Sequence, residues 1–164
     1  MTRIVVDSGP LIMFGRSELL GLPRQVAGEI LVPTTVFAEC TRETAKPGVS
    51  GLIAAETSGV FSVQTDPVPA SGLPNPASLD AGEIAALMLA RHLNCPVLMD
   101  EALGRKVAAG HGIPVIGGAG ILLAAKQRGL IAEIAPVLAA WRSWGYFLAP
   151  SLLDAVLARA GERR

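Results

Sequence analysis

Residues 3–10, RIVVDSGP, decide the fold class that we expect for this chain. The apolar run ends abruptly in Asp7, and the chain then turns through Ser8, Gly9 and Pro10. A continuous rather than alternating apolar run is typical of a strand buried on both faces, as in a parallel sheet. Because a buried strand has no structural need for a carboxylate at its tip, Asp7 is a candidate functional residue.

Short apolar runs alternate with helical patterns along the rest of the chain. The patterns predict strands at 3–7, 29–32, 96–100 and 114–117, an edge-like strand within 59–65, and helices at 10–22, 34–45, 80–94, 101–110, 121–129, 133–144 and 150–161. The proline-rich segment 66–78 is predicted to be a surface loop. This alternation predicts a three-layer α/β sandwich around a mostly parallel sheet. We expect one domain over 1–164, with 133–164 as a C-terminal helical extension.

The composition argues against a membrane protein, an exported protein and a protein that binds nucleic acid through phosphate contacts alone. The chain has 164 residues, of which 51% are hydrophobic, so it is long enough to bury a core. No apolar run reaches the roughly 18 residues of a membrane span, and Asp7 and Pro10 interrupt any signal-peptide pattern. Cys40 and Cys95 match no ligand or redox spacing, which suits a reducing cytoplasm. The formal net charge of zero argues against binding nucleic acid through phosphate contacts alone.

Acidic residues recur where predicted strands end or helices begin. Asp7 and Asp100 end two strands, Glu83 lies in the first turn of helix 80–94, and Glu39 lies in the helix after the second strand. Ligands of such sheets bind beyond the carboxyl ends of the strands, so these four carboxylates could converge. Two carboxylates about 4 Å apart repel by roughly 4 kcal/mol at an effective dielectric constant of 20, so the cluster would hold protons or cations.

Oxygen-only ligands select hard cations, so the expected metal is Mg²⁺ or Mn²⁺, as one or two ions. The two histidines, His92 and His111, are poorly placed to build a zinc site with these carboxylates. The natural chemistry of such a cluster is metal-assisted phosphodiester hydrolysis.

Each acidic residue also has a purely structural interpretation, and these alternatives stay open. Asp7 would open a turn or cap the next helix, although Ser8 could do this instead. Asp100 would cap helix 101–110, with the adjacent Glu101 favourable in its first turn. The D-x-x-E spacing of Asp80 and Glu83 suits a capping box, and Glu39 would be a solvated helix residue.

Four stretches, in this order, resemble the PIN domain family and specifically its VapC-like branch. They are DSGPLI (7–12), LDAGEIAALMLA (79–90), VLMDEALGRKVA (97–108) and IGGAGILLAAKQRGLI (116–131). The resemblance implies a metal-dependent ribonuclease, often the toxin of a toxin–antitoxin pair, with a small antitoxin protein as partner. It also implies a homodimer, and it assigns metal binding to Asp7, Glu39, Glu83 and Asp100. Glu101 is the alternative at the fourth position, where Asp100 is favoured because it ends the strand.

Two positions depart from the pattern of that branch. Gly9 and Gly118 stand where the branch usually carries hydroxyl residues, which leaves fewer groups to orient a water or a metal ligand. Ser8 is a candidate substitute for one of them. An alternative function is therefore a catalytically weak PIN-like module that binds RNA or a protein partner.

Three further features complete the sequence-based hypotheses. Arg105 and Lys106 follow Asp100 by about a turn and a half and are candidate RNA contacts or a solvated helix face. GGAG (117–120) opens a helix after a strand, which allows a small nucleotide-binding α/β domain as another alternative. WRSWGYF (141–147) is an aromatic cluster that suits helix packing, an oligomer contact or base stacking.

Overall fold

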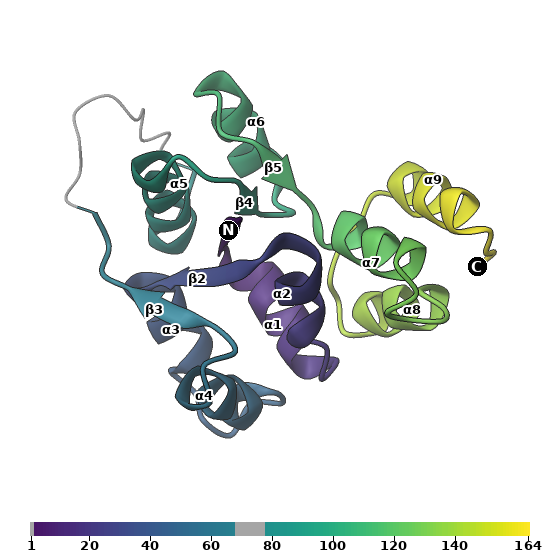
Figure 1. Ribbon diagram of the computed structural model, residues 1–164, viewed down its shortest axis with the longest axis horizontal. Helices are drawn as coiled ribbons and strands as arrows, with labels where there is room; N and C mark the ends of the chain where they lie inside the picture. The colour runs from purple at the N-terminus through teal and green to yellow at the C-terminus, as the bar shows by residue number, and fades with distance from the viewer. Residues whose placement is uncertain (1, 68–77) are drawn as a thin grey trace.

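A single five-stranded sheet organises the computed structural model, which describes residues 2–67 and 78–164 (Figure 1). Its strands follow the order β3-β2-β1-β4-β5, and all neighbouring strands run parallel. The strands are β1 (Arg3–Val6), β2 (Glu29–Pro33), β3 (Ser62–Gln64), β4 (Val97–Leu98) and β5 (Val115–Ile116). Helices flank this sheet, which confirms the predicted three-layer α/β fold and the position of β3 at an edge.

Nine helices lie in the described residues. They are α1 (Ser8–Arg16), α2 (Gly21–Ala27), α3 (Thr34–Thr41), α4 (Val49–Thr57), α5 (Ala81–Leu93), α6 (Ala102–Gly110), α7 (Gly118–Gln127), α8 (Ala135–Ser143) and α9 (Pro150–Ala160). None of them is long and apolar enough to cross a membrane. Both cysteines, Cys40 and Cys95, are buried and free.

β1 is the central strand because every residue after its first is apolar and buried. Ile4 and Val5 are fully buried and Val6 is nearly so. Val5 pairs with Leu31 of β2 on one side and with Val97 of β4 on the other. The continuous apolar pattern of residues 4–6 therefore indicates correctly that the strand is covered on both faces.

The structure corrects several predicted boundaries. Segment 10–22 is not one helix, because Glu18 adopts a left-handed conformation (φ 59°) and separates α1 from α2. The predicted strands 96–100 and 114–117 shorten to two residues each. α4 lies where no helix is predicted, although its buried residues Val49, Leu52 and Ala55 recur at helical spacing. Most of the predicted loop 66–78 lies outside the described residues.

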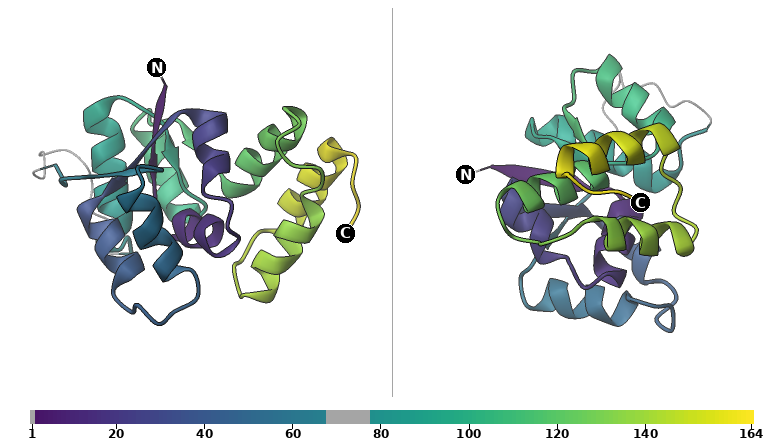
Figure 2. Two further views of the ribbon diagram at one scale, coloured as in Figure 1. Left: turned by 60° about the horizontal axis from the view of Figure 1, so that its bottom comes forward. Right: turned by 90° about the vertical axis from the view of Figure 1, so that its right-hand side faces the viewer.

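The three C-terminal helices, α7, α8 and α9, stand together at one end of the molecule (Figures 1 and 2). α7 joins them to the rest of the fold because it packs against both α2 and α9. Trp141 of α8 is fully buried, meets the ring of Phe14 edge to face at 5.1 Å and donates a 2.7 Å hydrogen bond from Nε1 to Ser17 Oγ. This part of the aromatic cluster is therefore a packing seam.

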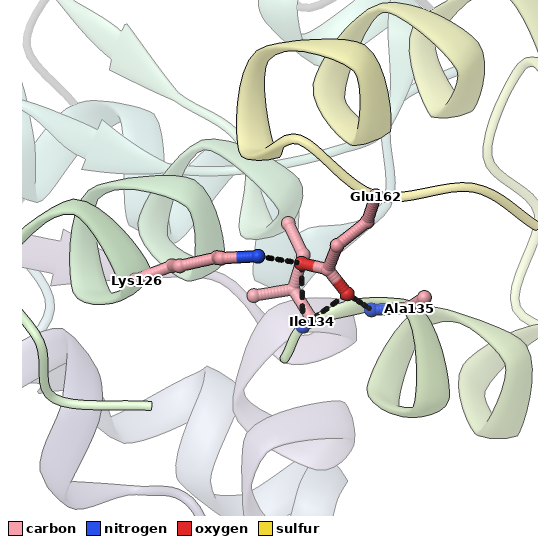
Figure 3. Close-up of polar contacts among 4 residues, drawn as sticks. All are labelled: Lys126, Ile134, Ala135 and Glu162. Atoms are coloured by element: carbon pink, nitrogen blue, oxygen red, sulfur yellow. Dashed lines mark hydrogen bonds and ion pairs between the residues drawn. The ribbon is translucent and has the colours of Figure 1, made fainter. Parts of the chain in front are cut away.

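Glu162 fixes the end of the chain to the other two C-terminal helices (Figure 3). Its carboxylate accepts hydrogen bonds from the backbone nitrogens of Ile134 and Ala135 at the start of α8, and it pairs with Lys126 Nζ of α7 at 2.8 Å. Desolvation alone would raise the pKa of Glu162, but these donors outweigh it and lower that pKa. The contacts explain how α8 begins without a capping side chain of its own.

Candidate metal centre

Asp7 lies directly after β1, at the carboxyl edge of the sheet. Its backbone N–H donates to the carbonyl of Leu98 at 3.0 Å, which holds it beside the end of β4. Its backbone takes the N-cap position of α1, but its side chain makes no capping hydrogen bond. The capping alternative for the Asp7 side chain is therefore wrong.

The Asp7 carboxyl group is the one buried charged side chain among the described residues, with 5% of its surface exposed. Its Oδ1 atom has no hydrogen-bond partner in that part of the chain. Desolvation raises the pKa of Asp7 to about 7. The Ser8 backbone N–H lowers this pKa in part, whereas the nearby carboxylates of Glu83, Asp80 and Glu39 raise it further. Such a group is stable at neutral pH when it holds a proton or contacts a cation.

Asp100 lies two residues beyond β4, at the same edge of the sheet. Its Oδ1 accepts a 2.9 Å hydrogen bond from the backbone N–H of Gly118, the first residue of α7. Its Oδ2 accepts a 2.7 Å hydrogen bond from the hydroxyl of Tyr146. The negative charge therefore meets the positive end of the α7 dipole, which is a favourable arrangement.

The N-cap of α6 is Glu101 and not Asp100. Glu101 accepts a 2.6 Å hydrogen bond from the backbone N–H of Gly104. The alternative in which Asp100 caps the predicted helix 101–110 is thus wrong. The Asp100 carboxylate instead accepts hydrogen bonds from Gly118 and Tyr146 at the edge of the sheet.

Asp80 and Glu83 form the capping box that their spacing suggests. The backbone N–H of Glu83 donates to Asp80 Oδ1 at 2.8 Å, and the backbone N–H of Asp80 donates to Glu83 Oε2 at 3.0 Å. Desolvation and the charges of Asp80, Glu101 and Glu39 raise the pKa of Glu83, although the capping bond lowers it in part. Glu83 therefore caps helix α5 together with Asp80 and is also surrounded by other carboxylates.

Glu39 lies in α3 and faces the start of α1. Its Oε2 accepts a 3.0 Å hydrogen bond from the hydroxyl of Ser8. The carboxylate also lies against Gly82 of α5, where a β-carbon would collide with it. Glu39 is thus half-buried between three helices and is not merely a solvated residue.

A cleft of about 710 Å³ opens over this edge of the sheet. Five carboxylates line it, whereas Arg105 is the only cationic side chain among the described residues that does so. The other wall is apolar and includes Phe147 and Leu152. The lining contains these predicted site residues: Asp7, Ser8, Asp80, Glu83, Asp100, Glu101 and Arg105.

Two of the predicted site residues lie outside that lining. Glu39 reaches Ser8 instead of the cleft, and Lys106 is exposed on the neighbouring surface of α6. Arg105 points back toward the sheet, since its Nη1 donates to the carbonyl of Met99 at 2.9 Å.

In residues 2–67 and 78–164, no three His, Cys, Asp or Glu side chains lie close enough together to hold one metal ion. Three of the predicted metal-binding carboxylates accept hydrogen bonds instead, Glu39 from Ser8, Glu83 from the Asp80 backbone and Asp100 from Tyr146. The donor chemistry nevertheless fits a hard cation, because carboxylates line the cleft and the Oδ1 atom of Asp7 has no hydrogen-bond partner among the described residues.

Tyr146 is a site residue that the sequence analysis did not single out. It stands in the aromatic cluster 141–147, yet its hydroxyl reaches a carboxylate 46 residues earlier in the chain. The sequence carries no periodicity that links these two positions. The same site also weakens the nucleotide-binding alternative, because the Asp100 carboxylate already occupies the N-terminus of α7 that GGAG would offer to a phosphate.

The comparisons with known proteins agree with this fold. A family model described as a PIN domain matches residues 3–162. A search of curated proteins finds no match. The match spans nearly the whole chain and does not distinguish the VapC-like branch from the rest of the family. With its parallel sheet and acidic cleft, the chain belongs to the PIN domain family, whose fold is of the nuclease type.

Proposed function

We propose that this protein is a divalent-metal-dependent ribonuclease that hydrolyses RNA phosphodiester bonds in the acidic cleft. The observation that carries the proposal is the buried, unpartnered Oδ1 of Asp7 in a cleft lined by four further carboxylates. A phosphate backbone does not enter such a cleft unless cations offset its negative charge. The family assignment supports the same chemistry.

The residues proposed to hold Mg²⁺ or Mn²⁺ are Asp7, Glu39, Glu83 and Asp100. When bound, the metal would activate water and stabilise charge on the phosphate. Asp7 supplies the oxygen that has no other partner, and Asp100 supplies a carboxylate fixed by two donors. Ser8 holds Glu39 near Asp7, and Glu83 presents its carboxylate from the first turn of α5.

RNA is the proposed substrate because an exposed aromatic ring and two basic side chains lie at or beside the cleft. Phe147 is 82% exposed at the cleft wall, so its ring is free to stack on an unpaired base. Arg105 lines the same cleft and Lys106 lies beside it on α6, where both suit phosphate contacts. This arrangement favours single-stranded RNA, whose bases can be splayed onto an aromatic ring.

The finer assignments are proposals that rest on the resemblance and, for the cellular location, on the two free cysteines. They are membership of the VapC-like branch, a toxin role in a type II toxin–antitoxin system, a small antitoxin partner, a homodimer, and a cytoplasmic location. We also propose that 1–164 forms one domain in which 133–164 is a helical extension.

A second candidate is a PIN-like module that binds RNA or protein without turnover. The observation that favours it is that, among the described residues, no three of the proposed metal-binding carboxylates lie close enough together to hold one ion. Gly9 and Gly118 also favour this candidate, because glycine has no hydroxyl group that could orient a water or a metal ligand.

The test is cleavage of a labelled single-stranded RNA pool by purified protein in Mn²⁺ or Mg²⁺. EDTA and the Asp100→Asn variant should both abolish cleavage. Asp154→Asn is the matched control, because Asp154 is an exposed carboxylate outside the cleft, and it should cleave normally. Absence of cleavage by a preparation that binds Mn²⁺ in calorimetry would contradict the ribonuclease and favour the binding module. Thermal stabilisation by nucleotides, retained in Asp7→Asn protein, would instead support nucleotide binding.

A further inference from the structure

Tyr146 enters the acidic site from the link between α8 and α9. In Figure 1 this link runs along the side of the C-terminal helices that faces α1 and the sheet. The Tyr146 hydroxyl donates to Asp100 Oδ2 at 2.7 Å and lines the same cleft as Asp7. A residue of the C-terminal helices therefore contacts a proposed metal ligand on the sheet.

Gly9 leaves the space that the tyrosine fills. A β-carbon at position 9 would lie 2.9 Å from the Tyr146 hydroxyl oxygen and 3.1 Å from a carbon of its ring. Contacts that short require one of the two groups to move. The φ angle of Gly9 is not positive, so it is this close approach, and not backbone conformation, that requires a glycine.

Gly118 makes the corresponding space for Asp100. A β-carbon there would lie 2.9 Å from Asp100 Oδ2 and 2.9 Å from the Trp141 ring. The two glycines thus flank the hydrogen-bonded pair of Tyr146 and Asp100 from opposite elements, α1 and α7.

The tyrosine ring is held by the core. Trp141 meets it edge to face, with ring centroids 5.7 Å apart and an interplanar angle of 86°. Trp141 is itself fixed by Phe14 and by its hydrogen bond to Ser17. The phenol therefore reaches Asp100 from a rigid support, as a group that orients a ligand must.

We propose that Tyr146 is a positioning residue that orients Asp100 for cation binding and supplies the hydroxyl group that positions 9 and 118 lack. This inference rests on the proposed function, because it assumes that Asp100 is a ligand. A carboxylate has about four lone-pair sites. The bonds from Tyr146 and Gly118 use one on each oxygen, which leaves a lone pair on each for a cation.

The first test measures Mn²⁺ affinity by calorimetry. Removal of a hydrogen-bond partner that orients a metal ligand typically weakens affinity 10- to 100-fold. We expect Tyr146→Phe to lose about tenfold while its melting temperature stays close to that of the parent. Trp144→Phe is the control, because Trp144 lies near the same link but packs on Arg16, and it should bind Mn²⁺ normally. Unchanged or tighter binding by Tyr146→Phe would overturn the proposal.

A second measurement separates this inference from the proposed function. Tyr146 is the only tyrosine of the chain, so protein made with 3-fluorotyrosine gives one ¹⁹F resonance. We expect that resonance to shift in Asp100→Asn and to broaden when paramagnetic Mn²⁺ is added. No shift in Asp100→Asn would overturn the role of Tyr146. A shift without broadening by Mn²⁺ would leave the hydrogen bond intact and contradict the metal site instead, and with it the proposed function.

Discussion

The backbone N–H of Asp7 donates a 3.0 Å hydrogen bond to the carbonyl of Leu98, which joins the end of the central strand β1 to the end of its neighbour β4. This bond holds the Asp7 carboxyl group at the sheet edge, where 5% of its surface remains exposed. The geometry of the parallel ladder therefore imposes the burial of a charge, and the pKa of Asp7 rises to about 7 as a consequence.

We expect the stability of the metal-free protein to fall as the pH rises from about 4 to 7. In that window the folded protein retains a proton on Asp7 that the unfolded chain has released, since the pKa is about 7 in the fold and 3.8 outside it. The full difference corresponds to at most about 4 kcal/mol. Asp7→Asn should therefore raise the free energy of unfolding in EDTA at pH 8 and flatten this pH dependence.

Urea unfolding at pH 5 and pH 8 measures this effect. Asp154→Asn provides the control, because Asp154 is exposed and should leave the pH profile unchanged. If the Asp7→Asn protein is less stable than the parent at pH 8, the carboxylate must have a compensating partner, and the cation hypothesis loses its main support.

Gly9→Ala should destabilise the protein even though alanine is favoured over glycine in a helix by about 1 kcal/mol. The reason is that the new methyl group would lie 2.9 Å from the Tyr146 hydroxyl oxygen. In a Tyr146→Leu background the same substitution should be neutral or stabilising. Thermal denaturation of the four proteins of this cycle gives the coupling energy, expected at about 1–3 kcal/mol. Additive effects would show that the two positions do not meet.

Phe147→Ala should weaken binding of single-stranded RNA roughly tenfold, since stacking on an aromatic ring contributes about 1–3 kcal/mol per base. Its stability should change by less than about 0.5 kcal/mol, because the side chain is 82% exposed. Fluorescence anisotropy with labelled RNA and Asp100→Asn protein measures affinity without cleavage. Leu130→Ala is the control for an exposed apolar residue outside the cleft. Equal affinity of both variants would remove Phe147 from the RNA site.

Glu162→Ala should lower the free energy of unfolding by about 2 kcal/mol, because it strips hydrogen bonds from two backbone N–H groups and from Lys126. The pKa of Glu162 is lowered, so its contribution is present above the unfolded pKa of 4.5 and is lost as the pH falls through the folded value. Asp154→Ala, which breaks an exposed pair with Arg164, should cost less than about 1 kcal/mol. Urea titrations compare the two, and equal losses would contradict a special role for Glu162.

Sequence patterns predicted those structural features that depend only on residues close together in the chain. The apolar run of β1 and the capping box of Asp80 and Glu83 are of this kind, and the structure contains both. The break between α1 and α2 is different. It coincides with the left-handed conformation of Glu18, which follows Ser17, and the Ser17 hydroxyl accepts a hydrogen bond from Trp141 far along the chain. A helical pattern in the sequence carries no record of such a contact.

The sequence by itself determined the fold class, because strand burial and strand–helix alternation are written in residue order. It also indicated which carboxylates would stand at the sheet edge, since Asp7 and Asp100 follow strands that run parallel. Only the tertiary structure decided how those carboxylates are held. Asp100 meets Tyr146 and Gly118, and Glu39 meets Ser8. These partners are brought together by packing between elements distant in the chain, and such contacts depend on three-dimensional distance instead of on sequence spacing.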